Sequence, residues 1–170
     1  MTAFIALLRA VNVGGTGKLP MAELKTMCDA AGLRGVRTYI ASGNVVFESD
    51  AAEAEVKAAI ESRLHAFSGK PVGVLVRTAA EMAAVLARNP FPDAPGNRVT
   101  ALFLDGPPPS DTLETLSGQD PEEEVRLGLR EIYVRYGAGM AHSKLKIPAA
   151  RTGTARNMNT VAKLAEMAAG

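Results

Sequence analysis

The residues best suited to chemistry lie near the C-terminal end of the chain. Five basic side chains stand between residues 142 and 165, where the sequence has no acidic residue. We expect the last helix to begin at Thr152 or Thr154, which puts the free backbone N–H groups of residues 155–157 at the positive end of the helix dipole. Such a helix start attracts phosphate or carboxylate, so the segment predicts an anion site.

Polar side chains around this helix start could converge on one ligand. Arg151 and Arg156 flank it, and Asn157 and Asn159 follow at close spacing although asparagine is a poor helix former. Residues three to four positions apart share one helix face, so Arg156 and Asn159 would point the same way. The alternative is an ordinary capped helix whose asparagine side chains hold neighbouring loops.

A glycine-rich loop, Asn12–Lys18, offers a second group that could wrap an anion. It does not match the phosphate-binding loop of nucleoside-triphosphate enzymes. Asn12 stands where that motif needs its first glycine, and Leu19 replaces the hydroxyl that binds magnesium. Two interpretations stay open: an anion-binding loop that uses Lys18, or a loop whose glycines only provide mobility.

Residues for catalysis or metal binding are few. Cys28 lies on an apolar helix stripe and is expected to be a packed thiol, and His65 lies at a helix edge. His142, near Lys144, is the better acid–base candidate because histidine titrates near neutral pH. With one cysteine and two histidines, the sequence predicts no metal centre and no cofactor. The acidic residues between positions 110 and 125 match no calcium loop.

Composition points to a folded chain. The 170 residues are 47% hydrophobic and 22% charged, with a net charge of +1. This balance argues against disorder, collagen and a generally basic nucleic-acid protein. No apolar run approaches the roughly 20 residues of a membrane helix, so we expect a cytoplasmic protein without a membrane partner.

Apolar periodicity divides the first 77 residues into six elements. They are a strand at 3–8, a helix from about 20 to 31, a hairpin with strands at 36–41 and 45–48, a helix from a capping pair Asp50 and Glu53 to about 69, and a strand at 72–77. The order βαββαβ is that of the ferredoxin-like unit, an α+β arrangement. We expect an antiparallel sheet with both helices on one face.

Residues 78–170 predict a second, related αβ half of order αβαββα. Thr78 and Glu81 form a capping box for its first helix, and Ser110 is expected to cap a short helix. A strand at 99–104, a hairpin of strands 125–127 and 132–136, and the last helix complete an antiparallel or mixed sheet. We expect the halves 1–77 and 78–170 to pack as one compact unit.

Short motifs at both ends of the chain carry a family resemblance. They include Leu7-Leu8-Arg9, Asn12-Val13-Gly14-Gly15, Ser42-Gly43-Asn44-Val45-Val46-Phe47 and Thr154-Ala155-Arg156-Asn157. With these motifs the chain resembles, over nearly its whole length, the mostly bacterial family called domain of unknown function 1697. The resemblance implies an α+β fold and no established activity, cofactor or partner. Met158 stands where that family usually has an aromatic residue, which argues against a stacking role there.

Three hypotheses about function follow. The first is a small phosphate- or carboxylate-bearing ligand at the start of the last helix, bound with help from the glycine-rich loop. Its nine candidate residues are Arg9, Asn12, Lys18, Ser42, Asn44, Arg151, Arg156, Asn157 and Asn159. The second is an enzyme that acts on such a ligand, with His142 or Lys144 as proton carrier. The third is a nucleic-acid or protein-interaction module that uses the basic C-terminal segment; nucleic acid is not favoured, because the strands lack the aromatic-rich RNA-recognition pattern.

Overall fold

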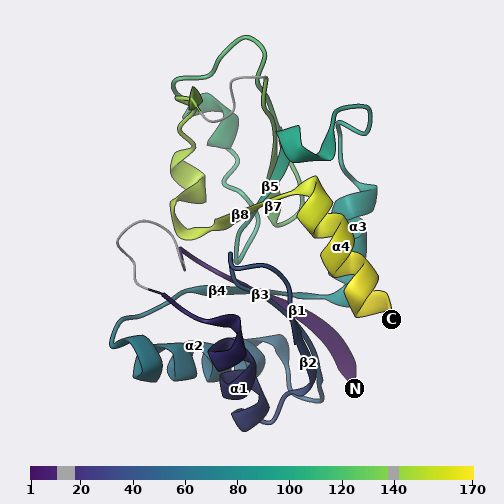
Figure 1. The fold of residues 1–170 in the computed structure, drawn as a ribbon. Coiled ribbons are helices and arrows are strands. Elements are labelled where there is room, and N and C mark those ends of the chain that lie inside the picture. Colours follow the sequence, from purple (N-terminus) through teal and green to yellow (C-terminus); the bar gives the residue numbers. More distant parts are fainter. Residues whose placement is uncertain (11–17, 138–141) are drawn as a thin grey trace. The chain divides into compact units, whose positions relative to one another are not determined.

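The computed structural model describes residues 1–10, 18–137 and 142–170, and these form an α+β fold (Figure 1). The described residues contain two four-stranded antiparallel sheets and four α-helices. The chain divides into two compact units, here called unit 1 (residues 1–82 and 164–170) and unit 2 (residues 83–163). No helix in the described ranges has the length and hydropathy needed to cross a membrane.

Unit 1 has the predicted order of strands and helices. Its elements are β1 (Thr2–Leu8), α1 (Met21–Ala30), β2 (Arg34–Thr38), β3 (Asn44–Ser49), α2 (Glu53–Ser68) and β4 (Val74–Thr78). The strands lie in the order β2-β3-β1-β4, so β1 and β3 are central. The register pairs Phe4 with Phe47 across β1 and β3, and the two rings stack at 5.8 Å.

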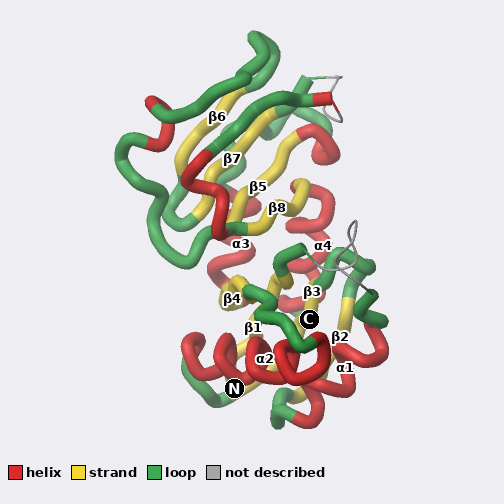
Figure 2. Tube along the Cα trace, turned by 90° about the vertical axis from the view of Figure 1, so that its left-hand side faces the viewer, coloured by secondary structure: helices red, strands yellow, loops and turns green. Residues whose placement is uncertain are grey.

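Helices α1 and α2 cover one face of this sheet, as Figures 1 and 2 show. Alternate residues of β1, among them Phe4, Ala6 and Leu8, pack in one core with the apolar stripes of both helices. The residues between them, Ile5 and Leu7, are also fully buried. Strand β1 is therefore buried on both of its faces.

Helix starts follow the sequence signals in one case and depart from them in another. The capping box of the helix after β4, α3 (Ala79–Ala87), is confirmed, because Thr78 N–H donates to Glu81 Oε1 (2.8 Å) and Glu81 N–H donates to Thr78 Oγ1 (3.1 Å). The predicted capping pair of α2 is wrong: Ala52 is the N-cap residue and provides no side-chain hydrogen bond. Just before this helix start, Ser49 Oγ accepts a hydrogen bond from Ala51 N–H (3.1 Å).

Unit 2 is built on the second sheet, whose strands lie in the order β6-β7-β5-β8 (Figure 2). The elements after β4 are α3 (Ala79–Ala87), β5 (Val99–Phe103), β6 (Glu124–Leu127), β7 (Glu131–Arg135), β8 (Thr154–Asn157) and α4 (Met158–Ala169). Three 3₁₀ helices, Gly96–Arg98, Thr112–Glu114 and Pro148–Thr152, join them. The expected short helix is the second of these, but the prediction that Ser110 caps it is wrong, because Asp111 is its N-cap residue.

One face of this sheet and the segment 145–149 share an apolar core. Val125, Ile132 and Val134 are its buried strand residues, and Leu145 and Ile147 pack against them. On β7, Tyr133 donates its hydroxyl to Val85 O (2.9 Å), which ties α3 to the sheet.

Candidate functional site

The start of the last helix differs from the sequence-based prediction. Residues Thr154–Asn157 form β8, which pairs antiparallel with β5, and α4 begins only at Met158. The backbone of residues 155–157 is therefore extended and belongs to an edge strand, where pairing with β5 uses alternate backbone groups. The predicted helix start at Thr152 or Thr154, with free N–H groups on residues 155–157, is wrong.

Two asparagines at the actual helix start have local structural contacts. Thr160 N–H donates to Asn157 Oδ1 (2.9 Å), so Asn157 caps α4. Asn159 is exposed, but its side chain lies against Gly96: a Cβ added there would come within 2.9 Å of Asn159 Cγ. These contacts match the alternative interpretation, in which the asparagines hold neighbouring segments.

Arg156 is a buried side chain rather than a surface cation. It is 7% exposed, and its Nη1 donates to Thr154 Oγ1 (2.9 Å) and to Ala155 O (2.8 Å). Burial lowers the pKa of Arg156 to about 10. Arg156 thus contributes to the β8 strand itself.

The other candidates of the C-terminal segment lie on the surface. Arg151 is exposed in the 3₁₀ helix Pro148–Thr152, and His142 and Lys144 are exposed in the segment before it. Between the latter two, Ser143 donates its hydroxyl to the carboxylate of Glu123.

The remaining candidates belong to unit 1. Leu8 N–H donates to Gly43 O (2.9 Å), which brings Arg9 to the same end of the sheet as Ser42 and Asn44. Asn44 is fully buried, and its Nδ2 donates to Tyr39 O (2.8 Å) and Ser42 Oγ (3.0 Å), which fixes the turn. Lys18 is exposed, and Asn12, with most of the glycine-rich loop, lies outside the described residues. That these residues share one ligand with those of unit 2 stays a prediction.

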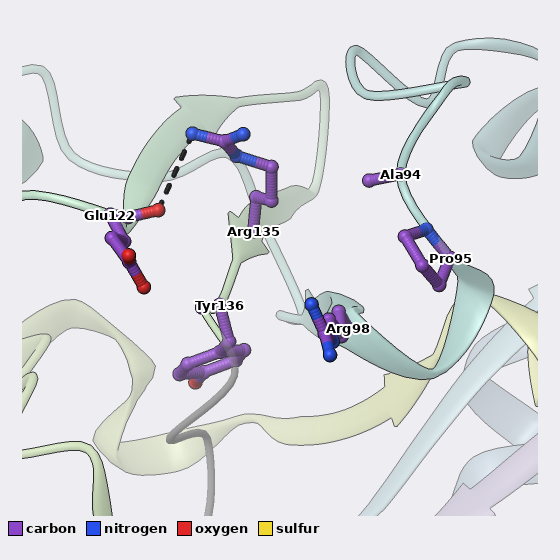
Figure 3. Close-up of a pocket in the computed structure, with 7 residues that line it drawn as sticks. Ala94, Pro95, Arg98, Glu122, Arg135 and Tyr136 are labelled. Carbon is purple, nitrogen blue, oxygen red and sulfur yellow. Dashed lines mark hydrogen bonds between the residues drawn. The ribbon is translucent and has the colours of Figure 1, made fainter.

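A polar pocket of about 420 Å³ lies within unit 2 (Figure 3). We call it the Arg98 pocket, and its lining residues are Ala94, Pro95, Arg98, Glu122, Arg135, Tyr136 and Gly137. Strand pairing assembles it: Val99 faces Arg135 across β5 and β7, and Tyr136 N–H donates to Arg98 O (2.8 Å).

Arg135 is compensated by its neighbours. Its Nη2 donates to Glu124 Oε1 (2.6 Å) and to Glu122 O (3.3 Å), the latter drawn in Figure 3. Its Cζ lies 5.8 Å from the centroid of the Phe91 ring, and so does the Cζ of Arg126. The Nε of Arg135 is buried and has no hydrogen-bond partner among the described residues. A charge-assisted ion pair and an aromatic face already balance this cation.

Arg98 and Glu122 present exposed charged groups that have no partner among the described residues. In the described part of the chain, the Arg98 guanidinium makes no hydrogen bond and no ion pair; only its backbone is bonded, to Pro95 and Tyr136. Within the same ranges, the Glu122 carboxylate is also without a partner, while Glu122 N–H donates to Asp120 Oδ1 (2.9 Å). The pocket therefore holds one available cation and one available anion.

Tyr136 supplies a neutral wall of the pocket. Burial, and secondly the charge of Glu123, raise the pKa of the Tyr136 phenol above its ordinary value. Glu123 itself is 4% exposed, and both of its carboxylate oxygens accept hydrogen bonds: Oε1 from Asp120 N–H (2.8 Å) and Oε2 from the hydroxyl of Ser143. Glu123 is thus part of the scaffold beside the pocket.

Sequence reasoning missed the Arg98 pocket. Arg98 and Tyr136 stand at the ends of two strands that the sequence did predict, 99–104 and 132–136, and antiparallel pairing of those strands brings these ends together. Polar residues at adjoining strand ends are therefore the signal that could have found the site. In residues 1–10, 18–137 and 142–170, no group of three or more His, Cys, Asp or Glu side chains could hold a metal ion.

Comparisons with known proteins agree with this fold and give no activity. The solved structure of the conserved bacterial protein SP0830 from Streptococcus pneumoniae is similar, with a TM-score of 0.79, 26% sequence identity and 98% of each chain covered. No curated protein matches the chain. The model of a family described as "Protein of unknown function (DUF1697)" matches residues 1–133. The chain therefore belongs to the DUF1697 family.

Proposed function

We propose that this protein binds a small ligand bearing a carboxylate or phosphate group, and that the Arg98 pocket is the binding site. The observation that carries the proposal is the Arg98 guanidinium, which lines the pocket without a partner among the described residues. Guanidinium groups recognise carboxylates and phosphates through paired, charge-assisted hydrogen bonds. This is the ligand class that the sequence predicts, at a different place in the fold.

The size and lining of the pocket support a small molecule. A volume of about 420 Å³ falls in the range of small-molecule sites, roughly 300 to 1,000 Å³. Ala94, Pro95 and the Tyr136 ring offer apolar surface beside the charged groups. Neither His142 nor Lys144 lines the pocket, so the proposal is binding and includes no catalytic step.

Calorimetric titration of the whole chain with a panel of small carboxylates and with inorganic phosphate tests the proposal. The variants are Arg98→Gln and, as a matched control, Arg88→Gln, which removes an exposed arginine of unit 2 outside the pocket. A hydrogen bond to a charged group contributes about 1.5–3 kcal/mol, so we expect Arg98→Gln to weaken binding about 10- to 150-fold. Arg88→Gln should bind like the wild type. Equal binding by wild type and Arg98→Gln, or no binding of any probe, would refute the proposal.

We also propose a ferredoxin-like layout for unit 1 and a cytoplasmic location for the protein. The ferredoxin-like layout of unit 1 is supported by the element order and by the strand order β2-β3-β1-β4. A cytoplasmic location is tested by fractionation of cells that express the protein.

A further inference from the structure

We infer that the ligand of the Arg98 pocket is a zwitterion: a small molecule of the amino-acid type, with its acidic group at Arg98 and its ammonium group at Glu122. The inference rests on the proposed function and names the class of ligand. Its starting point is that both side chains line one pocket while neither has a partner in the described residues.

The two charges do not neutralise each other. No ion pair joins the Arg98 guanidinium to the Glu122 carboxylate in the described part of unit 2. In the view of Figure 3, the Tyr136 ring lies between these two side chains. Both side chains are exposed and therefore solvated in the free protein, and a ligand with one negative charge would pair with Arg98 alone. A ligand with both charges satisfies both groups.

Glu122 is held in position for this role. Its carbonyl accepts from Arg135 Nη2 (3.3 Å), and its N–H donates to Asp120 Oδ1 (2.9 Å). Its side chain lies against Gly137: a Cβ added at that glycine would be 3.0 Å from Glu122 Cβ and closer still to its Oε2. The absence of a side chain at Gly137 therefore leaves the space that the Glu122 carboxylate occupies.

The neighbouring charged groups leave these roles to Arg98 and Glu122. Glu124 is paired with Arg135 (2.6 Å) and with Arg126 (2.9 Å), and Glu123 is occupied by Asp120 N–H and Ser143. Of the charged side chains that line the pocket, Arg135 already has an ion pair, whereas Arg98 and Glu122 have none within the described residues.

Matched probes test the inference on the whole chain by calorimetry. Each set contains an α-amino acid, the acid that lacks its amino group, and the amine that lacks its carboxylate, taken across the common amino acids. In the wild type, we expect at least one amino acid to bind at least tenfold more tightly than both of its single-charge analogues. Glu122→Gln should abolish the preference over the acid without weakening the acid itself, whereas Arg98→Gln should weaken both.

Two further variants separate a specific role of Glu122 from a general charge effect. Glu114→Gln removes an exposed acidic residue of unit 2 outside the pocket and should keep the preference. Gly137→Ala should displace the Glu122 side chain and lose the preference although the carboxylate is still present. Its control is Gly106→Ala, because an added Cβ there meets no atom of the described residues within 4 Å.

The outcomes distinguish this inference from the proposed function. If acids bind through Arg98 and the amino group adds no affinity, or if Glu122→Gln keeps the preference, the zwitterion is refuted and the acid-binding function stands. If no probe binds, or if binding does not depend on Arg98, both are refuted. Circular dichroism and melting temperatures of all variants confirm that each is folded.

Discussion

Replacing Gly153 by alanine tests the strand that the sequence did not predict. Gly153 connects the 3₁₀ helix Pro148–Thr152 to β8, whose first residue pairs with Phe103 of β5. A Cβ at this position would lie less than 3.0 Å from the Phe103 carbonyl oxygen and 2.9 Å from Leu104 Cδ2. A leucine side chain can rotate, but a strand carbonyl is fixed by its neighbours, so the start of β8 would have to move away from β5.

The expected cost follows from this overlap. Forcing atoms into a packed site costs about 1–3 kcal/mol, and for a chain of this length each kcal/mol lowers the melting temperature by about 2–4 °C. We therefore expect Gly153→Ala to melt about 2–12 °C below the wild type. If the last helix began near Thr152, the same substitution would place alanine at a helix start and would be tolerated, since alanine favours helix over glycine.

Thermal unfolding followed by far-UV circular dichroism measures the effect. Gly106→Ala is the matched control in the same unit, because its Cβ would meet nothing within 4 Å of the described atoms. Hydrogen exchange of residues 154–157 gives an independent measurement: the β5 pairing predicts that alternate amides of this edge strand are protected in the wild type and exchange faster in Gly153→Ala. A Gly153→Ala melting temperature within about 1 °C of that of Gly106→Ala would refute the close approach of β8 to β5.

Three further predictions concern single residues. Ile40 is half exposed and has φ 52°, a backbone conformation that is strained for a branched side chain but tolerated by asparagine. Ile40→Asn should therefore stabilise the fold by about 1 kcal/mol. An unchanged or lower melting temperature would contradict the backbone strain at Ile40. Burial, and secondly Asp29, raise the pKa of the Cys28 thiol to about 12. A disulfide reagent at pH 8 should therefore label Cys28 only when the protein unfolds. Rapid labelling of the native protein would contradict the burial of Cys28. Burial, and secondly Glu131, raise the pKa of Tyr133 from 10.0 to about 12, so the folded state favours the neutral phenol. The free energy of unfolding of the wild type, measured by urea titration, should therefore fall as pH rises from 10 to 12, and it should fall less in Tyr133→Phe. An equal fall in both proteins would contradict the assignment.

The elements of unit 1 were predictable because their signals are local. The stripe of Leu24 and Cys28 gives α1, and the all-apolar run of β1 indicates a strand buried on both faces. The capping box of Thr78 and Glu81 is confirmed atom by atom, since both of its hydrogen bonds lie within four residues. Signals of this kind depend on spacing along the chain, which the sequence contains directly.

Strand β8 had no such signal. Its four residues, Thr-Ala-Arg-Asn, show no apolar alternation, and the one buried side chain among them is Arg156. What makes it a strand is the partner, because β5 offers an edge of its backbone to residues 154–157. The sequence therefore predicts a helix start, with its anion site, in this polar segment next to a helix-forming run.

The same physical reason explains why charge runs along the sequence do not show which charged side chains are available to a ligand. Along the sequence, the basic segment between residues 142 and 165 predicts an anion site, but its Arg156 is buried in β8. The acidic segment between residues 110 and 125 is consistent with solvation, but Glu123 is buried in a complete hydrogen-bond network and Glu122 lines a pocket. A charged residue is available to a ligand only if its neighbours in space do not already neutralise it, as Glu124 neutralises Arg135. Those neighbours are set by the pairing of β5 with β7, which the spacing of residues along the sequence does not show.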